Sequence, residues 1–193
     1  NFLNYNFENL HQKSNKIEFL YAGNIGIGQG LEKVLPAAAK KLKNKINFKI
    51  IGDGSARENL EKAIAENNIS NIELINPINR INLMSYYKDA DILFLHLNDF
   101  DAYRKVLPSK LFEYASTNKP ILAGVSGYAK DFIINNIDHA EVFYPCNENE
   151  MIEKLEKICK YNTIINRNNF SIKFSRESIM INMAKDIMDI KNV

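Results

Sequence analysis

The chain has 193 residues, of which 46% are apolar and 25% are charged, and this length and composition suit one folded domain with a single hydrophobic core. Its 25 basic and 23 acidic residues nearly cancel, which excludes the concentrated positive charge that non-specific nucleic-acid binding requires. The sequence contains neither the roughly 20-residue apolar run of a membrane-spanning helix nor the pattern of a secretion signal.

From residue 17 onward, short apolar runs alternate with amphipathic stretches, as is typical of strands and helices around a parallel sheet. Strands are predicted at residues 17–22, 46–51, 72–75, 91–97, 120–125 and 140–144. Helices are predicted at residues 31–42, 56–66, 80–87, 108–115, 129–135 and 149–160. About six strands with helices between them indicate an α/β fold with a Rossmann-like, doubly wound parallel sheet, which we assign to residues 17–160.

Two end segments fall outside this pattern. Residues 1–16 are polar and rich in Asn, and we interpret them as a lead-in from a missing N-terminal domain. Residues 161–193 combine a polar linker with a last amphipathic helix at 175–190, whose apolar stripe consists of Ile179, Met180, Met183, Ile187 and Ile190. Such a stripe packs against this domain or a partner domain, and where it is exposed we expect it to promote self-association.

The cysteines and histidines do not form a recognisable site. Cys146 and Cys159 are not in CxxC spacing, and His11, His96 and His139 lie far apart. The sequence therefore predicts neither a zinc site nor a disulfide framework, and it favours a reducing, cytoplasmic setting without metal or cofactor. The segment His96-Leu97-Asn98-Asp99 at the end of the fourth strand could contribute to a ligand pocket, and we interpret the lone His96 as a packed structural residue.

The first candidate site is a glycine-rich turn between the first strand and the first helix, Gly23-Asn24-Ile25-Gly26-Ile27-Gly28-Gln29-Gly30. Free backbone N–H groups and the helix dipole favour an anion at such a place, and phosphate is the natural ligand. The turn departs from the dinucleotide fingerprint, because Gly30 follows Gly28 after two residues instead of three. A tight connection between strand and helix is the alternative interpretation.

The second candidate site follows the fourth strand and reads Arg104-Lys105-Val106-Leu107-Pro108-Ser109-Lys110-Leu111-Phe112-Glu113. Ligands of open α/β sheets bind at the carboxyl ends of strands, and Pro108 favours a helix start. That helix start and Lys110 can hold a diphosphate, while Glu113 can accept hydrogen bonds from two vicinal ribose hydroxyls. Alternatively, the three cations are solvated loop charges and Glu113 complements the helix dipole.

Three features occur together in a fixed order: the glycine-rich turn, Gly52-Asp53-Gly54 after the second strand, and Leu107 to Ala115 followed by Lys119-Pro120-Ile121. Over about residues 17–160 this set resembles the C-terminal, donor-binding domain of retaining GT-B-fold glycosyltransferases of family four, in particular bacterial amino-sugar transferases of the L-fucosamine type. The resemblance implies one half of a GT-B enzyme that uses a UDP-N-acetylamino sugar without a metal. It further implies a cell-surface polysaccharide or lipid-linked acceptor.

The resemblance also implies roles for individual residues. Glu113 corresponds to the second glutamate of the family's Glu, seven residues, Glu motif, which is usually a ribose ligand. The amides of Ser109, Lys110 and Leu111 would face the diphosphate. The loop Asn76-Pro77-Ile78 would read the uracil edge through its backbone.

Three positions depart from the family pattern. The first glutamate of the motif falls on Lys105, the common Arg of the turn is Asn24, and the common Lys of the turn is Gln29. Asn24 and Gln29 donate hydrogen bonds but carry no charge. We therefore expect Arg104, Lys105 or Lys110 to offset the charge of the diphosphate.

The chain does not contain a second set of strands that would form an acceptor domain. We expect that N-terminal domain, with the acceptor-side catalytic residues, elsewhere in the same enzyme, and we expect this fragment to bind donor without transferring sugar. A lipid-linked acceptor would place the enzyme at the inner face of the membrane. The rival functions are a nicotinamide- or nucleotide-binding module of an oxidoreductase and a non-catalytic nucleotide- or sugar-binding module.

Overall fold

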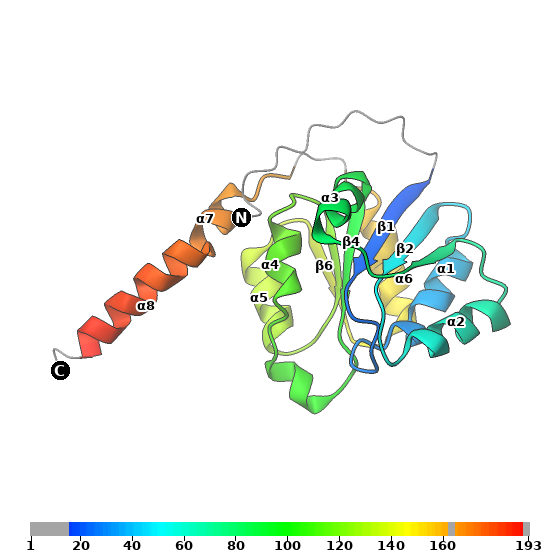
Figure 1. Cartoon of the computed structure of the whole chain (residues 1–193), viewed down its shortest axis with the longest axis horizontal. Helices are drawn as coiled ribbons and strands as arrows, with labels where there is room; N and C mark the ends of the chain where they lie inside the picture. Colours follow the sequence, from blue (N-terminus) through cyan, green and yellow to red (C-terminus); the bar gives the residue numbers. More distant parts are fainter. Residues whose placement is uncertain (1–15, 162–164, 191–193) are drawn as a thin grey trace.

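Six parallel strands form the centre of the molecule, in the order β3-β2-β1-β4-β5-β6, and the computed structural model describes residues 16–161 and 165–190 (Figure 1). The strands are β1 (Ile17–Ala22), β2 (Ile46–Ile51), β3 (Ile72–Ile75), β4 (Ile92–His96), β5 (Ile121–Gly124) and β6 (Ala140–Phe143). This order confirms the predicted doubly wound sheet. The chain reverses its winding direction between β1 and β4, and ligands of such sheets bind at the carboxyl ends of these two strands.

The central strands are buried on both faces. Every residue of β4 and of β5 is buried, as expected for strands that have helices above and below. On one face, Phe19 of β1 packs between Phe48 and Phe94, with ring centroids 4.7 and 5.0 Å away. The two candidate segments, the glycine-rich turn after β1 and the segment after β4, therefore follow strands that are packed on both faces.

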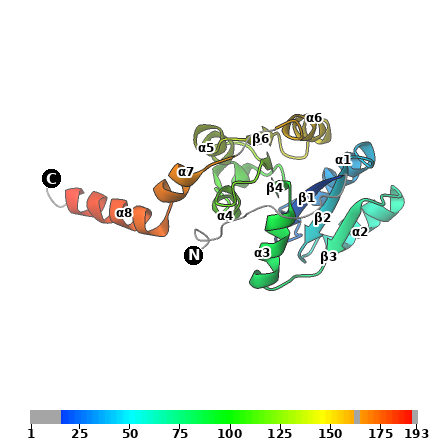
Figure 2. The same ribbon diagram turned by 90° about the horizontal axis from the view of Figure 1, so that it is seen from above.

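A different set of helices covers each face of the sheet (Figure 2). One face packs against α1 (Leu35–Lys41), α2 (Arg57–Glu66) and α6 (Glu148–Ile158). The other face packs against α3 (Arg80–Asp89), α4 (Lys110–Ala115), α5 (Tyr128–Asn136) and α7 (Asn168–Lys173). The result is the three-layer arrangement that the alternating pattern predicted.

Two predicted helices begin more than one residue later than the sequence indicated. The helix expected over 31–42 is divided into a 3-10 turn, η2 (Leu31–Lys33), and α1, because Pro36 occupies the first turn of α1 and begins a new helical segment. The helix expected from Pro108 begins at Lys110. Two short elements were not predicted, the 3-10 helix η3 (Asp101–Lys105) and α7.

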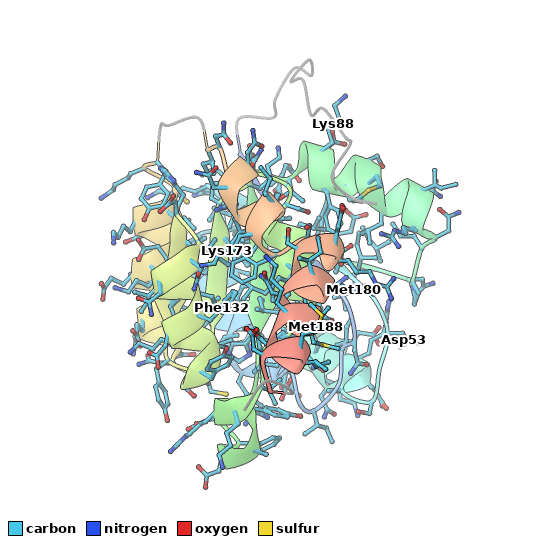
Figure 3. All side chains as sticks on the ribbon, turned by 90° about the vertical axis from the view of Figure 1, so that its left-hand side faces the viewer. Asp53, Lys88, Phe132, Lys173, Met180 and Met188 are labelled. Atoms are coloured by element: carbon cyan, nitrogen blue, oxygen red, sulfur yellow. The ribbon has the colours of Figure 1, made fainter. Side chains whose placement is uncertain are left out.

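The last helix, α8 (Arg176–Ile190), extends away from the sheet and contacts the rest of the described chain mainly through α7 (Figure 1). Its apolar stripe is exposed, with Met180 62% and Met183 60% accessible, and Met180 and Met188 are labelled on it in Figure 3. The stripe therefore does not pack on the described part of this domain. The side chain of Ile190, residues 1–15 of the lead-in and residues 162–164 of the linker lie outside the described residues.

Candidate functional site

Asn98 joins three loops at the carboxyl edge of the sheet. It follows β4, it is 3% exposed, and its backbone N–H donates to the Gly28 carbonyl at 2.8 Å. Its side-chain amide donates to the Ile27 carbonyl at 2.8 Å, and its Oδ1 accepts from the Cys146 thiol at 3.1 Å. Asn98 thereby holds the glycine-rich turn after β1 against the loops after β4 and β6.

His96, the last residue of β4, contacts the same turn through its imidazole ring. Its Nε2 accepts the Cys146 backbone N–H at 3.0 Å, and its Nδ1 contacts the Gln29 carbonyl. These partners assign the proton to Nδ1. Burial lowers the pKa of His96 to about 4, so the ring is neutral at neutral pH and has the packed structural role that the sequence indicated.

Asn24 and Gln29 pair with each other across the turn. The Asn24 Nδ2 donates to the Gln29 Oε1 at 2.9 Å, and the Gly26 backbone N–H donates to the same oxygen at 3.2 Å. At the two positions where the resemblance implies cations, the turn is therefore closed by neutral amides. The amides of Gly28 and Gly30 make no hydrogen bond within the described residues.

The Gly-Asp-Gly segment after β2 packs directly against this turn. A Cβ atom on Gly52 would lie 1.8 Å from the Gly23 carbonyl oxygen, and the φ of Gly52 is +147°. The Ile25 backbone N–H donates to the Asp53 carbonyl at 2.8 Å. The glycine at position 52 thus permits the two loops to touch, and the acidic side chain of Asp53 is exposed (Figure 3).

Glu113 is held from two sides on α4. Its Oε1 accepts from the Tyr87 hydroxyl at 3.1 Å, and its Oε2 pairs with the Lys110 Nζ at 2.7 Å. Burial raises the pKa of Tyr87 far above its ordinary value, so its hydroxyl stays protonated and donates. The buried Tyr114 fixes α4 against β1, because its hydroxyl accepts the Ala22 backbone N–H at 3.2 Å.

The start of α4 differs in one respect from what the resemblance implies. The Leu111 side chain is buried, and its N–H donates to the Pro108 carbonyl at 3.0 Å, so this amide is already used. The amides of Ser109 and Lys110 have no acceptor among the described residues. Two of the three expected donors are therefore free for a ligand.

The remaining residues of the sequence prediction lie farther along the same edge. Pro77 is exposed and Ile78 is half-buried in the loop after β3. Arg104 and Lys105 are exposed on η3, where Arg104 forms an ion pair with Asp101 at 3.3 Å. The structure thus puts every predicted position on a loop or helix start at the carboxyl edge.

Sequence reasoning missed two residues that shape the turn, Lys33 and Tyr103. Lys33 donates from its Nζ to the Asn98 Oδ1 at 2.9 Å. A Cβ atom on Gly28 would lie 2.2 Å from the Tyr103 hydroxyl, so η3 lies against the glycine-rich turn. A lone Lys or Tyr carries no sequence signal, and these contacts exist because the sheet order places β1 beside β4.

Within residues 16–161 and 165–190, no helix has both the length and the apolar character to cross a membrane. In the same ranges, no group of three or more His, Cys, Asp or Glu side chains is arranged to hold a metal ion. The expectation of a metal-independent reaction remains a prediction.

Comparison with protein families gives one extensive match. The family described as "Glycosyl transferases group 1" matches residues 5–174. The putative colanic acid biosynthesis glycosyl transferase WcaI of Escherichia coli (strain K12) is 33% identical over 97 residues, which are 50% of this chain and 24% of that protein. The probable glycosyltransferase WbjE of Pseudomonas aeruginosa is 24% identical over 157 residues, 80% of this chain and 38% of that protein.

Solved structures share the fold. The structure of Anabaena Alr3699/HepE in complex with UDP and glucose has a TM-score of 0.73 at 13% sequence identity. The matched region covers 90% of this chain and 48% of the Alr3699/HepE chain. The lipopolysaccharide outer core galactosyltransferase WaaB, in its apo form, has a TM-score of 0.72 at 16% sequence identity. The matched region covers 93% of this chain and 51% of the WaaB chain. This chain therefore spans about half the length of these structures and less than half that of the curated relatives.

Proposed function

We propose, from the premise that this chain belongs to the glycosyl transferases of group 1, that it is the donor-binding, C-terminal half of a retaining GT-B enzyme. The donor is a nucleotide-diphosphate sugar, with UDP as the nucleotide and an N-acetylamino sugar as the transferred group. The observation that carries the proposal is the position of Glu113, a fixed carboxylate beside two free amides at the carboxyl edge. The solved complex of Alr3699/HepE with UDP and glucose supports the choice of UDP.

Glu113 has the properties of a ribose ligand. An ionised carboxylate offers about four acceptor positions, of which Tyr87 and Lys110 each use one. The remaining positions can accept the two vicinal hydroxyls of a ribose. Because its two protein partners fix the carboxylate before the nucleotide arrives, little side-chain entropy is lost on binding.

The diphosphate lies between the start of α4 and the glycine-rich turn. The free amides of Ser109 and Lys110 point from the first turn of α4, and those of Gly28 and Gly30 come from the opposite side of the switch point. Donors that are already oriented stabilise the charge that develops on a leaving diphosphate. With these donors we expect transfer chemistry without a metal.

The uracil lies over the loop after β3. Residues 76–78 directly precede Asn79, whose side chain caps α3 by accepting the Asn82 N–H at 2.9 Å. The cap fixes the backbone next to Pro77 and Ile78, and a fixed backbone presents carbonyl and N–H groups to a base edge. The contacts of this loop with the base select UDP over other nucleotides.

The complete enzyme requires an acceptor-binding domain in addition to this chain. The N-terminal domain of the same enzyme would supply it, together with the acceptor-side catalytic residues. The acceptor is a cell-surface polysaccharide or a lipid-linked oligosaccharide at the inner face of the membrane. The chain described here binds donor and transfers nothing without that domain.

Calorimetric titration with UDP, GDP, ADP and NAD tests the proposal. We expect UDP to bind most tightly, and Glu113→Gln to weaken UDP by about tenfold through loss of charged hydrogen bonds to the ribose. Glu66→Gln, at an exposed position near the end of α2, is the matched control and leaves UDP affinity unchanged. Binding of NAD with no binding of UDP would replace this proposal with the oxidoreductase module.

A further inference from the structure

Two of the three cations that the sequence indicated for the charge of a bound diphosphate are already paired with carboxylates. Asn24 and Gln29 are neutral and bonded to each other. Lys110 is paired with Glu113 at 2.7 Å, and Arg104 with Asp101 at 3.3 Å. Each of these two cations is therefore already offset by a carboxylate.

Lys33 differs from these cations because its partner is neutral. Its Nζ is held 2.9 Å from the Asn98 Oδ1, and an ammonium group has three protons to donate. The other two make no hydrogen bond within the described residues, and the side chain is exposed. Lys33 thus brings a full positive charge and two unused donors to the place where β1 and β4 diverge.

The position of this ammonium group is fixed by a buried side chain. Asn98 is oriented by its own bonds to the Ile27 and Gly28 carbonyls, so its Oδ1 points to Lys33 and not away from it. The same bonds tie Lys33 to the turn whose free amides are at Gly28 and Gly30. Burial is the main cause of the low pKa of His96, the hydrogen bond to the Gln29 carbonyl acts against it, and the nearby charge of Lys33 lowers the pKa further.

We propose that Lys33, anchored by Asn98, supplies the positive charge that binds the diphosphate of the donor in place of the cations absent at positions 24 and 29. The inference rests on the proposed function, since it concerns the same nucleotide site. An anchored ammonium loses less side-chain freedom on binding than a free one. Lys105, which is exposed on η3, is the competing candidate for this role.

Titration of the chain with UDP and with uridine separates charge recognition from nucleoside recognition. We expect Lys33→Met to weaken UDP by about tenfold to a hundredfold, as for loss of a charge-assisted hydrogen bond, and to leave uridine affinity unchanged. Lys33→Arg retains the charge and is expected to restore most of the UDP affinity. Lys40→Met, at an exposed position of α1, is the matched control without effect, and the melting temperature of each variant checks that it is folded.

Two results would overturn the inference while leaving the proposed function in place. One is UDP binding that Lys33→Met does not change but Lys105→Met weakens. The other is an equal loss of UDP and uridine affinity in Lys33→Met, which would show that Lys33 acts only on the shape of the turn. Failure of the unmodified chain to bind UDP would instead contradict the proposed function itself.

Discussion

The Tyr87 hydroxyl donates a hydrogen bond to the Glu113 Oε1 at 3.1 Å, and this bond joins α3 to the carboxylate that we assign to the ribose. The Tyr87 ring is fully buried and packs edge-on against Tyr114, with ring centroids 5.8 Å apart. The hydroxyl therefore acts from a fixed position. Glu113 thus owes part of its orientation to a residue 26 positions away in the sequence.

Tyr87→Phe keeps the buried ring and removes only this hydrogen bond. We expect the free energy of unfolding to fall by about 1–2 kcal/mol, because the bond involves a charged acceptor. UDP affinity should fall by a few-fold, since Glu113 then has Lys110 as its one fixed partner. Urea denaturation and calorimetry measure the two effects. Unchanged stability and unchanged UDP affinity would show that the bond does not position Glu113.

Gly52→Ala places a methyl group against a backbone atom. The new Cβ would lie 1.8 Å from the Gly23 carbonyl oxygen at a φ that side chains rarely adopt, so we expect a loss of about 3 kcal/mol or more. Gly28→Ala is the matched control, because its Cβ meets the movable end of the Tyr103 side chain. We expect it to cost about 1 kcal/mol. Equal urea midpoints for the two variants would contradict the close contact between the loops.

His96 gives the protein a dependence of stability on pH. Burial lowers its folded pKa to about 4, whereas the unfolded value is about 6.5. Between these values the unfolded chain binds more protons, so stability falls as the pH drops from about 6.5 to about 4, by up to about 3 kcal/mol. Denaturation at several pH values should show this loss in the unmodified chain and less of it in His96→Gln. NMR titration of His96 with a midpoint near its ordinary value would contradict the prediction.

Arg167 attaches the C-terminal helices to the sheet. Arg167 is 3% exposed, and its guanidinium donates to the Asp138 carbonyl through Nε at 3.0 Å and to the Lys119 carbonyl at 2.9 Å. We expect Arg167→Met to cost about 2–4 kcal/mol, because buried carbonyls lose their donor. Hydrogen exchange of α7 should accelerate strongly.

Lys173→Met is the matched control for Arg167. Lys173 is exposed, donates to the Asn136 side chain at 3.1 Å, and has its Nζ 5.0 Å from the centroid of the Phe174 ring. Such exposed contacts contribute little, so its loss is expected to change stability by less than about 0.5 kcal/mol. Protection of α7 that is the same in both variants would show that Phe170 and Phe174, which pack on the sheet face, hold the helix without Arg167.

The fold was predictable because its signals are local. The apolar run over 91–97 contains β4. Gly52 directly follows β2, where the Gly23 carbonyl oxygen leaves no room for a Cβ atom. In a parallel sheet all carboxyl ends meet at one edge, so strand positions were enough to place Glu113 and the glycine-rich turn at the same edge. The short helices η3 and α7 were missed because about one turn carries too little periodicity to be recognised.

The contacts inside the site were not predictable in the same way. Asn24 and Gln29 occupy the positions of two expected cations and bond to each other. The sequence shows that the cations are absent, but it does not show the hydrogen bond. The Lys33–Asn98 contact joins residues 65 positions apart, and it depends on the neighbouring positions of β1 and β4. Side-chain pairing of this kind follows from tertiary packing and has no local pattern.

Backbone amide NMR of the isotope-labelled chain during titration with UDP tests the central claim most directly, because it reports where the nucleotide binds. We predict that the largest shift changes fall on Gly28, Gly30, Ser109, Lys110 and Ile78, all at the carboxyl edge, while amides near Lys45 and Asn118 at the opposite edge do not change. Shift changes concentrated at the opposite edge, or none at millimolar UDP, would contradict the assignment of a donor site to this chain.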